Sequence, residues 1–126
     1  MSTFVRSLTV EIHNASDTEI VVSGCLLTGG EWATAPIPGA PIFATQAYGN
    51  GASDAQSLLG GQIVLMPASG GSITSAWNWP SGSPVFVSVS TAATNLAVTH
   101  QISNTQTNNP TIRLVIANAS SIAKIV

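Results

Sequence analysis

The side chains best suited to binding in this chain are aromatic. Two of its three tryptophans lie in Trp77-Asn78-Trp79-Pro80, beside a Ser81-Gly82-Ser83 turn. Tryptophan is large, flat and amphipathic, so its ring suits membrane interfaces, sugar faces and hydrophobic cores. Because Trp77 and Trp79 are two residues apart, their side chains point the same way if they lie on a strand. Trp32 and Tyr48, from a segment rich in proline and glycine, are candidates to complete an aromatic cluster.

Three uses of these four rings remain open. They can dip into a bilayer interface, where Trp and Tyr are favoured. They can stack on a sugar ring or line a small-molecule pocket. They can also close the ends of the fold as core residues. We take Trp77, Trp79, Trp32 and Tyr48 as the candidate lipid- or ligand-binding residues.

The chain offers little for catalysis. His13 and His100 lie far apart in sequence, and a zinc site would need a third ligand that no pattern indicates. The carboxylates are scattered, without an obvious pair for glycoside hydrolysis. The run Gly51-Ala52-Ser53-Asp54-Ala55 lacks the closing glycine of a nucleophile elbow. We therefore predict a protein that is not an enzyme and has no catalytic residues, bound metal or cofactor.

Charge is scarce along the whole chain. Charged residues make up 6% of the sequence and the net charge is −2, whereas about a quarter of residues are charged in an ordinary globular protein. Three lysine and arginine residues cannot neutralise many phosphates, so the sequence argues against nucleic acid as a partner. Weak repulsion between copies makes a homo-oligomer, or a self-assembling structural protein, a further alternative.

An alternation of apolar and polar residues with a period of two indicates the elements that position these residues. It runs through residues 8–13, 85–90, 96–102 and 111–116, with turn signals between such stretches, among them Tyr48-Gly49-Asn50-Gly51. Residues 28–61 form the irregular part. The pattern and length predict an all-β protein, a single antiparallel β-sandwich domain of about eight short strands over residues 1–126.

The N-terminal residues do not resemble a signal peptide. They lack a basic region followed by a continuous apolar stretch. No run approaches the roughly 20 apolar residues of a transmembrane helix. We expect the protein to be cytoplasmic at synthesis, with release by a non-classical route if it acts on membranes.

Two pieces of the chain resemble the aegerolysins, small acidic β-sandwich proteins of fungi and bacteria that recognise membrane lipids. The first is the opening run Leu8-Thr9-Val10-Glu11-Ile12-His13-Asn14. The second is Gly60-Gly61-Gln62-Ile63-Val64-Leu65, followed after a turn by Ile73-Thr74-Ser75-Ala76-Trp77-Asn78-Trp79-Pro80-Ser81-Gly82-Ser83. The chain departs from the family pattern in two ways. Trp79 replaces, at about the same position, the cysteine that the family has beside a proline, and the family's Cys-Gly-Arg-Ser-Asp segment is missing. Actinoporin-like toxins share a related sandwich.

The resemblance implies a protein that recognises membrane lipid through a surface aromatic cluster, with Trp77 and Trp79 facing the membrane. It also implies a role as one component of a cytolytic toxin. A pore-forming partner protein would then be needed, because the chain shows no amphipathic N-terminal helix of the actinoporin kind. The alternative function is a lectin or small-ligand-binding module that uses the same rings, so the expected ligand is membrane lipid or carbohydrate.

Overall fold

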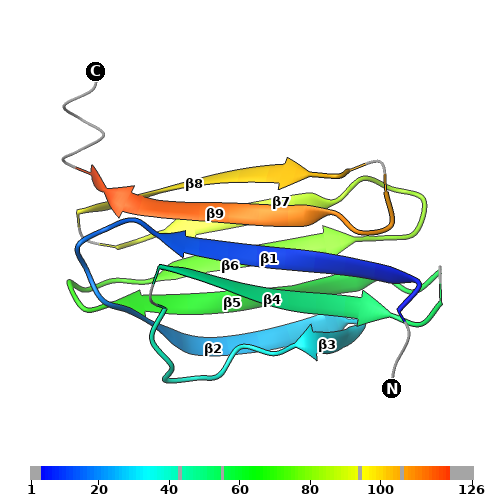
Figure 1. The fold of residues 1–126 in the computed structure, drawn as a ribbon, viewed down its shortest axis with the longest axis horizontal. Coiled ribbons are helices and arrows are strands. Elements are labelled where there is room, and N and C mark those ends of the chain that lie inside the picture. The colour runs from blue at the N-terminus through cyan, green and yellow to red at the C-terminus, as the bar shows by residue number, and fades with distance from the viewer. Residues whose placement is uncertain (1–3, 43, 55, 94, 106, 120–126) are drawn as a thin grey trace.

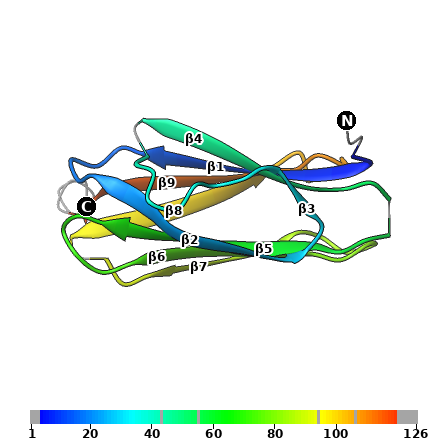
Figure 2. The same cartoon turned by 90° about the horizontal axis from the view of Figure 1, so that it is seen from below.

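Two stacked β-sheets form a sandwich in the computed structural model, which describes residues 4–42, 44–54, 56–93, 95–105 and 107–119 (Figures 1 and 2). The first sheet has the strand order β3-β4-β1-β9-β8 and the second has the order β2-β5-β6-β7. No described segment is a helix long and apolar enough to cross a membrane. The strands are β1 (Arg6–Asn14), β2 (Ile20–Gly29), β3 (Glu31–Thr34), β4 (Thr45–Ala52), β5 (Leu59–Pro67), β6 (Ile73–Trp79), β7 (Phe86–Thr91), β8 (Leu96–Ser103) and β9 (Thr111–Asn118).

The predicted all-β sandwich is confirmed, with nine strands in the described residues. Alternation builds its core, because every second side chain of a strand points toward the opposite sheet. The largest fully buried side chains are therefore aliphatic, many of them two residues apart along a strand, and they come from both sheets: Leu8, Val10, Ile12, Ile20, Val22, Leu59, Ile63, Leu65, Ile73, Ile112, Leu114 and Ile116. Removal of this apolar surface from water, at about 25 cal/mol per Å², is the main force that holds the two layers together.

One strand pair departs from the predicted antiparallel arrangement. β1 and β9 are parallel, with Thr9 opposite Thr111 and Asn14 opposite Ile116, whereas the other pairs are antiparallel. Parallel neighbours begin at the same end of a sheet. The start of β1 and the β8–β9 loop therefore lie together, at the right of Figure 1, where β6 also ends.

The interpretation of Tyr48-Gly49-Asn50-Gly51 as a turn is wrong. These residues lie inside β4, which pairs with β1 without interruption from Ala52 opposite Arg6 to Thr45 opposite His13. Gly51 allows the ring of Phe4 to pack closely against the β4 backbone, since a Cβ at Gly51 would lie 2.6 Å from that ring. Glycine inside a strand can mark such an approach as well as a turn, and only the tertiary contact distinguishes the two.

Candidate ligand-binding cleft

The first residue of β1 is an arginine that faces the interior. Burial alternates along β1, and Arg6 is in phase with Leu8, Val10 and Ile12. This alternation directs the Arg6 side chain between the sheets, and the residue is only 4% exposed. A cation thus lies at the end of the core, just beyond the last apolar side chains.

Neutral groups surround the Arg6 guanidinium. Its carbon lies 3.8 Å from the centre of the Trp79 ring, which is the geometry of a cation–π contact. Its N–H groups donate to the carbonyl oxygens of Ser57, Trp79 and Pro80. All five carboxylate side chains of the protein belong to described residues, and none lies within ion-pair distance of Arg6. The guanidinium is therefore held in place without being neutralised.

Asp54 interacts electrostatically with Arg6 without forming an ion pair with it. The Asp54 carboxylate accepts hydrogen bonds from the Ser57 hydroxyl and from the backbone N–H groups of Gln56 and Ser57. These bonds lower the pKa of Asp54, and they tie Asp54 to Ser57, whose carbonyl accepts a hydrogen bond from Arg6. Burial lowers the pKa of the Arg6 guanidinium, and the charge of Asp54 opposes that shift. Since a buried cation without a contacting counter-charge is costly, the site favours an anion from solution.

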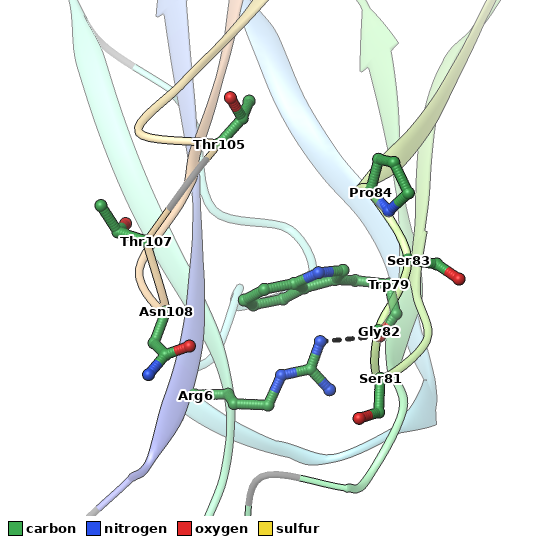
Figure 3. A pocket seen from close by; sticks show the side chains of 9 residues that line it. All are labelled: Arg6, Trp79, Ser81, Gly82, Ser83, Pro84, Thr105, Thr107 and Asn108. Carbon is green, nitrogen blue, oxygen red and sulfur yellow. Dashed lines mark hydrogen bonds between the residues drawn. The ribbon is translucent and has the colours of Figure 1, made fainter.

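A cleft of about 540 Å³ opens over Arg6 and Trp79 (Figure 3). The turn between β6 and β7 forms one wall and the β8–β9 loop forms the other. Of the five N–H groups of the guanidinium, the three carbonyl contacts in the described structure leave at least two for a ligand. The walls add hydroxyl and amide groups, and they consist of Ser81, Gly82, Ser83, Pro84, Thr105, Thr107 and Asn108. The cleft can therefore accept an anionic group surrounded by polar atoms.

Trp79 is the one predicted aromatic residue that lines this cleft. It is 7% exposed, and the guanidinium of Arg6 covers one face of its ring. The Trp79 ring therefore holds the Arg6 guanidinium in position, and the face that Arg6 covers is not available for stacking on a sugar. Contact between Trp79 and a ligand stays a prediction.

Trp77 is a core residue, which corrects the surface position that the resemblance implies. It is 3% exposed, and its indole N–H donates to Asn50 Oδ1 at 3.0 Å. Its ring meets Trp32 edge to face, with centroids 6.1 Å apart. Gly61, opposite Trp77 on β5, makes room for the ring, because a Cβ there would lie 2.9 Å from it. Trp77 and Trp79 do point the same way, as their spacing predicts, but they point inward.

Tyr48 lies in a different part of the fold. It is 5% exposed on β4, and burial raises the pKa of its hydroxyl, with a smaller contribution from Cys25. It lines a second cavity of about 210 Å³ together with Ile37, Gln46 and residues near them, and none of these lines the Arg6 cleft. The four predicted residues therefore do not form one surface cluster. Trp32 packs on Trp77, Trp79 packs on Arg6, and Tyr48 is separate.

The two histidines do not come together in a site. His13 Nδ1 lies 2.7 Å from Thr45 Oγ1 at an exposed position, and His100 is exposed on β8. Within the described residues, no group of three or more His, Cys, Asp and Glu side chains is arranged to hold a metal ion. The Arg6 cleft is thus the described feature with the most distinctive chemistry.

Arg6 is the residue that the sequence reasoning missed. The signal was present, since Arg6 continues the alternation of Leu8, Val10 and Ile12 in phase. A charged residue at a core-facing position near a strand end requires compensation, and this makes it a candidate for function. The cleft walls carry no comparable signal, because their Ser, Thr and Asn residues are common in loops.

No protein-family model matches the sequence, and no curated protein matches it either. Solved structures do match over most of the chain. RahU, crystallised in complex with a Tris molecule, has a TM-score of 0.66 at 13% identity, covering 92% of this chain and 97% of RahU. The lipid-binding protein Nakanori has a TM-score of 0.69 at 15% identity, covering 88% of this chain and 70% of Nakanori. This chain has their fold.

The same fold extends to a lectin. The Xerocomus chrysenteron lectin XCL has a TM-score of 0.55 at 9% identity, covering 87% of this chain and 99% of the lectin. At such low identity the likeness is one of fold, and it is consistent with the aegerolysin-like resemblance at that level. The ligand must be argued from the residues of this chain.

Proposed function

We propose that this protein is an aegerolysin-like, non-enzymatic binding protein that takes the polar headgroup of a membrane lipid into the Arg6 cleft. The observation that carries the proposal is the buried Arg6 guanidinium, which stacks on Trp79 and has none of the five side-chain carboxylates within ion-pair distance. An anionic oxygen of the headgroup would accept the remaining N–H groups of Arg6. Hydroxyl and amide groups of the cleft walls would contact the rest of the headgroup.

Exposed apolar side chains at the same end of the sandwich support a membrane over a soluble ligand. Val5 precedes Arg6 and is 44% exposed, Leu58 follows Ser57 and is 36% exposed, and Phe86, which opens β7, is 67% exposed. These side chains can enter the headgroup region while the cleft receives the headgroup. Burial of each would add to binding in proportion to its apolar area.

Vesicle binding of matched variants tests the proposal. Phe86 and Met66 are exposed on the outer face of the second sheet, but Met66 lies near the far end of β5, away from the cleft. We expect co-sedimentation with vesicles of phosphatidylcholine, sphingomyelin and cholesterol. Phe86→Ser should lower the affinity for these vesicles about tenfold, which corresponds to about 1.4 kcal/mol of binding free energy. Met66→Ser should leave the affinity unchanged. Equal behaviour of the two variants, or no binding by the wild-type protein, would refute the membrane orientation.

Arg6→Gln tests the headgroup site itself. This variant should lose vesicle binding, and inorganic phosphate should compete with vesicles for the wild-type protein. Far-UV circular dichroism and urea unfolding would establish that Arg6→Gln is folded. Retained binding by a folded Arg6→Gln variant would rule out the cleft as the headgroup site, whatever the outcome for Phe86.

Carbohydrate is the second candidate ligand, because hydroxyl groups occur on both cleft walls and Asn108 adds an amide, and such groups can bond sugar hydroxyls. Its chief difficulty is that Arg6 covers one face of Trp79. Competition by free sugars, but not by phosphate, would favour it. We further propose that any cytolytic role depends on a pore-forming partner and on non-classical release. Dye release from vesicles by this protein alone would contradict the need for a partner.

A further inference from the structure

The two long sides of the sandwich differ in how their edge strands are protected. β3 and β2 border one side, and β8 and β7 border the other, as the uppermost part of Figure 1 shows for the latter pair. An edge strand exposes unpaired backbone N–H and C=O groups, and proteins usually shield such an edge with charge, proline, bulges or a covering loop.

The β2 and β3 side has these protections. Residues 39–42 run along β2 and bond to it, with Gly39 N–H donating to Val22 O at 2.7 Å and Ile42 N–H donating to Ile20 O at 2.7 Å. β2 also has two register shifts. β3 is only four residues long, begins with Glu31 and has a register shift of its own.

On the β7 and β8 side, the described residues provide none of these protections. β7 pairs with β6 and β8 pairs with β9 without any register shift. Neither strand contains proline, aspartate, glutamate, lysine or arginine. Among the described residues, no backbone hydrogen bond from another segment reaches the outer edge of either strand. Both strands therefore present open and uncharged pairing edges.

The hydrophobic core also reaches the surface between these two strands. Val87 and Val89 on β7, and Val98 and Ile102 on β8, pack against the core but remain partly exposed. The nearest charged side chains on the first sheet, Arg113 and Glu11, pair with each other, with Nε and Oε1 3.4 Å apart. We call the β7 and β8 edges, with these four apolar residues, the open side.

We propose that the open side is the site where a second copy of this chain docks and continues both sheets. A second copy fits because an edge strand is the natural complement of an edge strand. Two identical strands related by a two-fold axis pair antiparallel, so the interface closes as a dimer. Uncharged edges and a net charge of −2 create little repulsion between the copies. Docking would cover the partly exposed valine and isoleucine side chains.

Sedimentation velocity over a range of protein concentrations tests the proposal. The wild-type protein should shift from monomer toward dimer as its concentration rises. Ser88→Lys combined with Thr99→Lys places one charge on each open edge, at exposed positions, and should keep the protein monomeric. Thr9→Lys combined with Thr74→Lys adds the same charge to inner strands of the two sheets and should still dimerise.

Hydrogen exchange on the wild-type protein provides a readout that needs no variant. Amides of β7 and β8 should become more protected at high concentration, while those of β3 should not change. A wild-type protein that stays monomeric at every concentration would overturn the proposal. So would a dimer that the edge lysines leave intact, or one that protects other strands.

Discussion

Replacement of Asn50 by alanine should reveal how the core around Trp77 is held. Asn50 on β4 is fully buried, and its side chain makes three hydrogen bonds. Its Oδ1 accepts from Trp77 Nε1 on the other sheet at 3.0 Å, and its Nδ2 donates to the carbonyls of Gly29 and Glu31, both at 3.1 Å. Asn50 thus joins the two sheets and the β2–β3 connection at one point.

The expected loss follows from these three bonds. A buried hydrogen bond contributes about 1 kcal/mol net, and more is lost when its partner is left unsatisfied. Asn50→Ala should therefore lower the free energy of unfolding by about 3 to 4 kcal/mol. Trp77→Phe breaks one of the bonds and also removes part of a buried ring, so it should cost at least about 1 to 2 kcal/mol. Each single variant removes the hydrogen bond between Trp77 and Asn50, so the sum of the two single losses counts this bond twice. The stability loss of the double variant should therefore be smaller than that sum by about 1 kcal/mol.

Urea unfolding followed by circular dichroism measures these differences. Asn78→Ala is the matched control, since Asn78 follows Trp77 on β6 but is exposed, and its cost should stay within about 0.5 kcal/mol. An Asn50→Ala cost below about 1 kcal/mol, or additive effects of Asn50→Ala and Trp77→Phe, would refute the cross-sheet network.

Three further predictions concern the rest of the fold. Glu11→Gln should cost less than about 1 kcal/mol in urea unfolding, because its partner Arg113 is 52% exposed; a larger cost would contradict a solvent-screened pair. Gly71 and Gly39 have similar φ angles of +84° and +88°, but only at Gly71 would a Cβ collide with backbone. Gly71→Ala should therefore cost more than about 2 kcal/mol and Gly39→Ala about 1 kcal/mol in the same assay, and equal costs would contradict the packing. The lowered pKa of Asp54 means that its hydrogen bonds stabilise the fold above the unfolded-state pKa, and that this stability is lost as pH falls through the folded-state pKa. Unfolding measured from pH 7 down to about pH 3 should thus show a smaller acid loss for Asp54→Asn, and identical profiles would refute the role of the carboxylate.

The alternation of apolar and polar residues in the sequence predicted the strands in which it is strong. Strands without a clear alternation were not predicted. Residues 8–12 and 112–116 alternate because one face of each strand packs on the opposite sheet, and this period is visible without knowledge of the partner. β3 and β4 were missed because glycines and prolines surround them. β4 is a strand because it pairs with β1, a segment distant in sequence, and β3 is a strand because it pairs in turn with β4.

The tryptophans show the same division. Their spacing established that Trp77 and Trp79 share a face, since side-chain direction in a strand is a local property. Whether that face is covered depends on the opposite sheet, which supplies Asn50 to Trp77 and Arg6 to Trp79.

The sequence by itself determined the class of fold, the low charge and the phase of each alternating strand, Arg6 included, because these depend on residues close together in the chain. Only the tertiary structure decided that Arg6, Trp79 and two loops meet in one cleft, and that one side of the sandwich is left open. Both results depend on which strands become neighbours. The packing of two sheets selects those neighbours among segments that have no local relation to one another.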